Sequence, residues 1–221
     1  MPDPSALVPA VLLLLMTLVL LWFAFGTQRN IGRGNRLLRW LQDGLPALGP
    51  KTTLRWLGSS VAELRIAQPR HPYREAQVMV VLEPRDLGAL WAVARSRGRR
   101  DFLILRLSLV RAPLARADLV SPRAWTAGDR RPDEQEPELR ESWTDAAGQP
   151  VELRHDGRAD LASLRGHWDG LARQSGGVWR LSVRPTVPHL EIHLLAPDPE
   201  RAGARALLDE VAVLARALAA H

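Results

Sequence analysis

The chain has 221 residues, an ordinary apolar fraction of 46% and a formal net charge of +6, and it contains no cysteine. This length allows one or two domains, and the lack of cysteine excludes disulfides, thiolate metal sites and cysteine nucleophiles. The basic excess is local: residues 28–56 carry +5 (six basic, one acidic), residues 1–27 carry −1, and the rest carries +2 (24 basic, 22 acidic). Because a nucleic-acid binder usually spreads positive charge over its folded domain, a nucleic-acid partner is not expected.

Residues 6–26 form an uncharged apolar run, rich in Leu and Val, after a short N-terminus of residues 1–5. About 20 such residues are needed to cross a hydrocarbon core of roughly 30 Å, and a helix satisfies its own backbone hydrogen bonds there. A cleaved signal peptide would begin with basic residues and have an apolar run of about 7–15 residues. Here residues 1–5 contain the acidic Asp3 and no basic side chain, and the apolar run is longer. The sequence therefore predicts a single-pass transmembrane helix that acts as an uncleaved signal anchor.

Arginines follow this run and none precedes it, at positions Arg29, Arg33, Arg36 and Arg39. Positive residues flank the cytoplasmic end of a transmembrane helix. We therefore expect a protein of the cell membrane with residues 1–5 outside and the C-terminal domain in the cytoplasm.

Residues 27–51 are predicted to form a basic amphipathic juxtamembrane segment. Its apolar residues recur at spacings of three and four: Leu37, Leu38, Trp40, Leu41 and Leu45. Such a helix can lie in the headgroup plane with its leucines in the acyl boundary. Alternatively, its arginines only flank the span and its leucines pack on the domain. Gly44, Pro46, Gly49 and Pro50 are predicted to end the element.

Residues 52–221 are predicted to form one α+β domain. Residues 61–66 alternate like a half-buried strand, residues 76–84 are typical of a central strand, and residues 101–110 give the clearest strand pattern. A helix is expected to open at Pro84 and Asp86, where the carboxylates of Glu83 and Asp86 would cap its first N–H groups. Its apolar stripe is Leu87, Leu90, Trp91 and Ala94, and Gly98 ends it.

The C-terminal part repeats the order of strand, proline loop, strand and helix. Residues 178–183 and 190–194 alternate like strands, and Leu207, Val211, Leu214 and Leu218 form the apolar stripe of the last helix. Two strand–strand–helix units related by duplication are one hypothesis. Between them lie a charged, Pro-rich excursion at about 121–142, a hairpin around residues 145–149, and a helix from about Arg158.

This pattern predicts a two-layer fold, with an antiparallel-leaning sheet and helices on one face. A ferredoxin-like or related sandwich is the specific expectation.

Two groups of polar residues are candidate sites. The first is a set of arginines suited to anionic lipid or phosphate: Arg33, Arg36, Arg39, Arg95, Arg97, Arg99 and Arg100. The alternative for the last four is a basic helix end followed by a solvated turn. The second group is His189, Glu191 and His193, which share one face of a strand. The outer two would stand about 13 Å apart, too far for one metal ion with bonds near 2 Å, so no metal or other cofactor is expected.

No sequence motif for nucleotide binding or nucleophilic catalysis is present. The leading hypothesis is a membrane-anchored module for binding, scaffolding or assembly, which contacts the bilayer and a protein partner or a second copy of itself. Two alternatives stay open. One is a tethered enzyme whose site is assembled from distant residues, and the other is a module for anionic lipid or nucleic acid that uses Arg95–Arg100.

Overall fold

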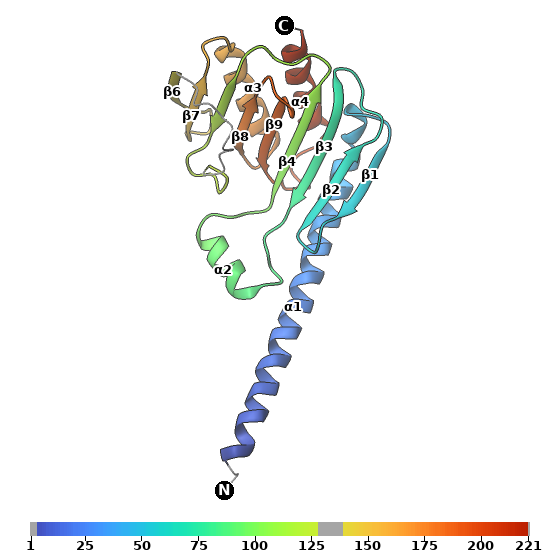
Figure 1. Cartoon of the computed structure of the whole chain (residues 1–221), viewed down its shortest axis with the longest axis vertical. Coiled ribbons are helices and arrows are strands. Elements are labelled where there is room, and N and C mark those ends of the chain that lie inside the picture. The colour runs from blue at the N-terminus through green and yellow to red at the C-terminus, as the bar shows by residue number, and fades with distance from the viewer. Residues whose placement is uncertain (1–3, 128–138, 221) are drawn as a thin grey trace.

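The computed structural model describes residues 4–127 and 139–220, so the middle of the predicted excursion at about 121–142 lies outside the described residues. The chain is an α+β protein (Figure 1). Its helices are α1 (Pro4–Gln42), the short 3-10 helix η1 (Leu45–Ala47), α2 (Gly88–Ser96), α3 (Leu161–Gln174) and α4 (Ala204–Ala219). Its strands are β1 (Thr52–Trp56), β2 (Val61–Ile66), β3 (Tyr73–Val81), β4 (Phe102–Leu109), β5 (Ala117–Val120), β6 (Leu139–Thr144), β7 (Pro150–His155), β8 (Val178–Val183) and β9 (Leu190–Leu195).

The strands of the described residues form one nine-stranded open sheet in the order β1-β2-β3-β4-β9-β8-β5-β7-β6, and every neighbouring pair is antiparallel. The pairing of β4 with β9 joins the two halves of the chain, with Leu105 opposite Ile192. The prediction of an α+β fold with an antiparallel sheet is confirmed, and the ferredoxin-like arrangement is not. The predicted hairpin is β6–β7.

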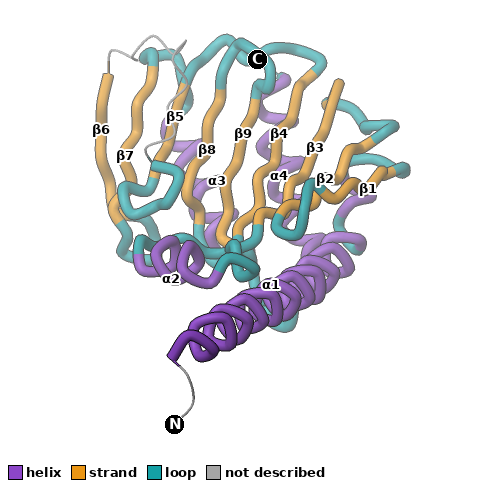
Figure 2. The backbone as a smooth tube through the Cα atoms, turned by 60° about the horizontal axis from the view of Figure 1, so that its bottom comes forward, coloured by secondary structure: helices purple, strands orange, loops and turns teal. Residues whose placement is uncertain are grey.

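Helices α3 and α4, η1 and the last turns of α1 cover one face of the sheet (Figure 2). Alternate residues of β4 point to this face, and Leu103, Leu105 and Leu107 are fully buried there. The apolar stripe of α4 meets them with Leu207 and Val211, which are also fully buried. Burial of a large aliphatic side chain stabilises a fold by about 1.5–3 kcal/mol, so this continuous layer is the main source of stability.

The opposite face of the sheet is polar over much of its area. In one cross-strand row, Arg106 lies opposite Glu191, Glu191 opposite Ser182, and Ser182 opposite Asp118. A smaller apolar cluster (Val81, Phe102, Ile104, Ala124 and Trp179) lies on the strand ends nearer α2. The first residues of the predicted excursion contribute to this cluster through Ala124.

Helix α1 is continuous from Pro4 to Gln42, and its N-terminal half projects away from the domain (Figure 1). Among the described residues it is the one helix long and apolar enough to cross a membrane; its most apolar window has a mean hydropathy of 2.7 and no buried residue. Its C-terminal turns belong to the domain core: Leu37 and Leu41 are fully buried, and the Trp40 indole donates to the Ala202 carbonyl at 2.5 Å. Of the two interpretations of residues 27–51, the structure therefore agrees with the one in which the leucines pack on the domain.

Helix α2 lies at the end of the sheet where α1 leaves the domain (Figures 1 and 2). It begins at Gly88 with Leu87 as its N-cap and has no side-chain cap, so the predicted start at Pro84–Asp86 was wrong. Asp86 accepts a hydrogen bond from the Ser59 hydroxyl at 2.6 Å instead. The pairs β2–β3 and β8–β9 share their order along the chain and their antiparallel pairing, but α4 covers the sheet whereas α2 does not.

Candidate functional site: an arginine pocket beside the long helix

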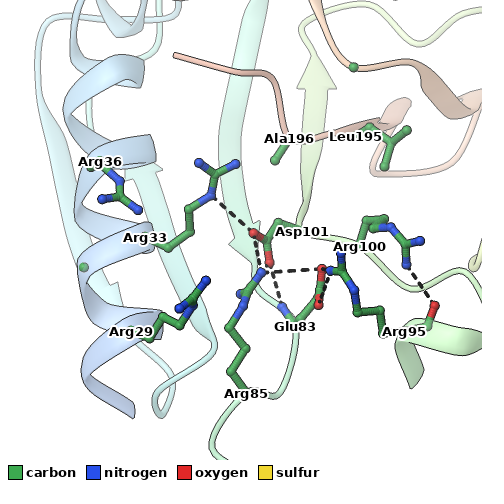
Figure 3. Close-up of a pocket in the computed structure, with 12 residues that line it drawn as sticks. Arg29, Arg33, Arg36, Glu83, Arg85, Arg95, Arg100, Asp101, Leu195 and Ala196 are labelled. Atoms are coloured by element: carbon green, nitrogen blue, oxygen red, sulfur yellow. Dashed lines mark hydrogen bonds and ion pairs between the residues drawn. The ribbon is translucent and has the colours of Figure 1, made fainter. Parts of the chain in front are cut away.

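A cleft of about 740 Å³ opens between α1 and the end of the sheet, and we call it the arginine pocket (Figure 3). Its six arginines and two carboxylates give a formal charge of +4 (six positive, two negative). The lining residues are Arg29, Gly32, Arg33, Arg36, Glu83, Arg85, Arg95, Arg100, Asp101, Gly176, Leu195 and Ala196.

The pocket is assembled from segments far apart in the sequence. Helix α1 contributes Arg29, Arg33 and Arg36, whose spacings of four and seven residues place them on one side of the helix. Glu83 and Arg85 come from the β3–α2 connection, Arg95 from the last turn of α2, and Arg100 and Asp101 from the approach to β4. These side chains converge because α1 crosses the end of the sheet.

Gly26 allows α1 to approach the β3–α2 connection closely. A Cβ atom at this position would lie 2.6 Å from the Asp86 Cα and would overlap the Arg85 carbonyl. Both of these atoms belong to the backbone, which cannot move aside as a flexible side chain can. The absence of a side chain at Gly26 therefore brings Arg85 within reach of the arginines of α1.

Asp101 is the centre of the ion-pair network, and its side chain is 8% exposed. It accepts two hydrogen bonds from Arg85, at 2.9 and 3.0 Å, and one from Arg33 Nε at 3.3 Å. The backbone N–H of Glu83 donates a fourth at 2.8 Å. The two bonds from Arg85 form a bidentate pair, which fixes orientation as well as distance.

Glu83 holds the α2 side of the pocket, and its side chain is 3% exposed. It accepts hydrogen bonds from Arg95 at 3.0 and 3.1 Å and from the Trp91 indole at 2.5 Å. Arg85 lies 3.4 Å from the same carboxylate and also donates to Asn30 Oδ1 at 3.1 Å. Since donors surround both carboxylates, Glu83 and Asp101 hold the arginines that contact them in fixed orientations.

The other three arginines of the pocket, Arg29, Arg36 and Arg100, have no carboxylate partner in the described part of the chain. Arg29 and Arg36 are exposed, and Arg100 donates only to the carbonyls of Arg95 and Arg99, at 2.9 and 2.7 Å. Guanidinium groups bind phosphate and carboxylate through paired N–H donors. The pocket is thus a set of oriented arginines with a surplus of positive charge, which suits an anionic ligand.

The structure brings together four of the seven arginines named from the sequence: Arg33, Arg36, Arg95 and Arg100. The other three lie outside the pocket. Arg39 donates to the Asn35 carbonyl at 3.4 Å, Arg97 caps α2, and Arg99 donates to the Leu82 carbonyl at 3.4 Å and lies over the Trp125 ring. Sequence reasoning missed Arg85, Glu83 and Asp101 as site residues and assigned Arg29 only to the membrane flank. One signal was available: Glu83 and Asp101 adjoin two strongly apolar strands, where a charge needs a partner.

The histidine motif forms a buried hydrogen-bond network on the polar face of the sheet. His193 bonds Glu191 at 2.9 Å and the Thr126 hydroxyl at 3.2 Å, whereas His189 Nδ1 accepts from the Leu109 N–H at 2.8 Å. Burial raises the pKa of Glu191, but His193, Arg106 and Arg184 outweigh it and lower the pKa to about 2. Burial lowers the pKa of His189. Within residues 4–127 and 139–220, no group of three or more His, Asp or Glu side chains is placed so that it could hold one metal ion.

No protein-family model matches this chain, and a search of characterised proteins gives no significant match. Its function is therefore to be inferred from the arginine pocket and its place beside α1.

Proposed function

We propose that this chain is a single-pass membrane-anchored binding module whose arginine pocket holds a phosphate-bearing anion at the bilayer surface. One observation carries the proposal: a pocket with a formal charge of +4 lies where the apolar half of α1 ends. The short chain length between the apolar run and the pocket supports a site at the bilayer surface.

Arg29 and Arg33 follow Gly26 by three and seven residues. At a helical rise of about 1.5 Å per residue, they lie roughly 4–5 Å and 10 Å beyond the apolar run. The headgroup zone on each side of a bilayer is about 5–7 Å thick. If residues 6–26 fill the hydrocarbon core, the part of the pocket near Arg29 lies among the headgroups. The part near Arg33 then lies in the adjacent water.

A phosphate group can reach such a pocket from either side. It can belong to an anionic lipid of the same leaflet, or to a soluble phosphate compound that approaches from the water. Both offer oxygens that match the guanidinium fork, and both are favoured by the surplus positive charge. Because donors surround Glu83 and Asp101, the geometry favours binding over acid–base catalysis.

The proposal includes the orientation expected from the sequence, with the N-terminus outside the cell and the domain in the cytoplasm. Protease added to sealed cells should then spare the domain, and digestion from outside would overturn the orientation. A protein partner or self-association stays a prediction, which crosslinking and affinity capture from native membranes would test.

The binding proposal is tested with the full chain in lipid nanodiscs. One set contains only zwitterionic lipid and is titrated with inorganic phosphate; a second set contains an anionic phospholipid, and binding to its headgroup is followed by ³¹P NMR. The variant Arg29→Gln/Arg36→Gln removes two pocket charges. The control Arg201→Gln/Arg205→Gln removes two charges from exposed side chains, which are 87% and 83% exposed, near and at the start of α4.

Each arginine near an anionic headgroup contributes on the order of 1 kcal/mol, so the pocket variant should bind roughly 30-fold more weakly than the wild-type chain. The control variant should bind as the wild type does. Binding in the first set alone identifies soluble phosphate as the ligand, and binding in the second alone identifies the lipid. Equal affinity of the pocket and control variants in both sets would overturn the proposal.

A further inference from the structure

Helix α2 and its N-cap residue expose five apolar side chains. Leu87, Leu90 and Val93 are 50%, 52% and 48% exposed, Ala89 and Ala92 are also exposed, and Ala94 is the one residue of the helix that is buried. A helix at the surface of a water-soluble domain usually carries polar residues on its outer face. Exposed apolar side chains gathered on one short helix typically mark a contact with a membrane or another molecule. We call the exposed residues Leu87, Ala89, Leu90, Ala92 and Val93 the α2 apolar surface.

The place of α2 in the fold identifies what would cover this surface. The indole of Trp22, near the end of the apolar run of α1, donates to the Arg85 carbonyl at 3.2 Å. The same ring packs on Gly88, the first residue of α2, where a Cβ atom would lie 2.7 Å from Trp22 Nε1. Helix α2 therefore starts at the level of Trp22, beside the last turns of the apolar run, and this side-by-side arrangement is visible in Figures 1 and 2.

The positive charge at the end of α2 is also consistent with a lipid bilayer beside this helix. Arginines come directly after the apolar residues and none precedes them within the helix: Arg95, Arg97, Arg99 and Arg100. Apolar side chains combined with basic ones are the composition of helices that lie in the plane of a bilayer. Aromatic rings such as Trp22 and Trp91 are favoured at the same depth.

We propose that the α2 apolar surface inserts into the boundary between headgroups and acyl chains, in the leaflet from which α1 emerges. The domain then contacts the bilayer at two points, and the arginine pocket lies between them. This inference rests on the proposed membrane span of α1, but it does not depend on whether the pocket binds phosphate. It fixes the rotation of the domain about the axis of α1, which a single anchor would leave free.

Because the chain contains no cysteine, a single introduced cysteine can be labelled selectively. A nitroxide is attached to Leu90→Cys in the full chain, reconstituted in nanodiscs of phosphatidylcholine and phosphatidylglycerol without any other integral protein. Collision with oxygen, which concentrates in lipid, is compared with collision with a water-soluble nickel chelate. Val93→Cys provides a second position on the same surface, and since both native side chains are about half exposed, the fold should tolerate the label.

Two matched positions calibrate the depth. Leu14→Cys lies in the apolar run of α1, and Val187→Cys, 63% exposed, lies in the β8–β9 loop at the opposite end of these strands from the pocket. Labels at positions 90 and 93 should lose most of the nickel accessibility seen at position 187 and gain oxygen accessibility. Nickel accessibility at 90 and 93 equal to that at 187, with position 14 in lipid, would overturn this inference alone. Nickel accessibility at position 14 would overturn the proposed membrane span as well.

Discussion

Replacement of Asp101 by Asn should destabilise the domain, because Asp101 receives charged hydrogen bonds from Arg85 and Arg33 and is itself buried. The Asn side chain keeps the shape and can still accept the Glu83 N–H, but it carries no charge and places an NH₂ group near the guanidinium groups. Removal of one partner from a buried ion pair costs about 3–5 kcal/mol. Since Arg33 is 30% exposed and can turn toward water, the lower end, about 3 kcal/mol, is expected.

This change is measured by urea unfolding of the full chain in detergent micelles, followed by tryptophan fluorescence. With a slope of about 1–3 kcal/mol per M, the midpoint should fall by roughly 1–3 M. The matched control is Asp209→Asn, which breaks an exposed pair with Arg205 on α4 and should change the stability by less than about 0.5 kcal/mol. Equal midpoints for Asp101→Asn and Asp209→Asn would refute the view that Asp101 holds the pocket together.

Two further substitutions test the close packing of α1 and the network around Glu191. Gly26→Ala should lower the free energy of unfolding by about 1–3 kcal/mol through overlap with the Arg85–Asp86 backbone, whereas Gly32→Ala, with no atom within 4 Å, should raise it by up to about 1 kcal/mol. Equal effects in the same urea assay would contradict the close approach. The pKa of Glu191 is lowered from 4.5 to about 2, so its charge stabilises the fold above pH 4.5, and this contribution is lost as the pH falls toward 2. Glu191→Gln should therefore be less stable than the wild type by roughly 3 kcal/mol at pH 7 and equally stable near pH 2, and a difference independent of pH would contradict this.

The parts of the fold that sequence reasoning predicted are those with a strong local pattern. Residues 101–110 and 190–194 alternate cleanly because one side of each strand faces the apolar layer, and both are strands of the sheet. Strands β1 and β5 were not predicted: most of β1 is exposed and β5 has only four residues, so neither carries a clear alternation. The order in which nine strands pair depends on contacts distant in sequence, which no local pattern records.

The arginine pocket, too, could be predicted only in part from local sequence patterns. The arginines of α1 and of residues 95–100 stand out as charge clusters in the sequence, but nothing local indicates that they meet. Their meeting depends on Gly26, which lets α1 pass close to the β3–α2 connection, and on Asp101, which joins Arg85 to Arg33.

Helix α2 shows how an amphipathic pattern can mislead. Its stripe of Leu87, Leu90, Trp91 and Ala94 has the spacing of a core-facing helix, yet Leu87 and Leu90 are half exposed. The spacing of apolar residues indicates that a surface will be covered, but not whether protein or lipid covers it. The proposal that lipid covers α2 rests on the position of this helix beside the apolar run of α1.

The most direct test of the central claim is native mass spectrometry of the full chain released from nanodiscs that contain an anionic phospholipid, with inorganic phosphate in the buffer. The mass of a retained adduct identifies its source as lipid or phosphate. The wild type and the Arg201→Gln/Arg205→Gln control should each retain one such adduct, and Arg29→Gln/Arg36→Gln should lose it. Retention by the pocket variant at the wild-type level would contradict an anion site in the arginine pocket.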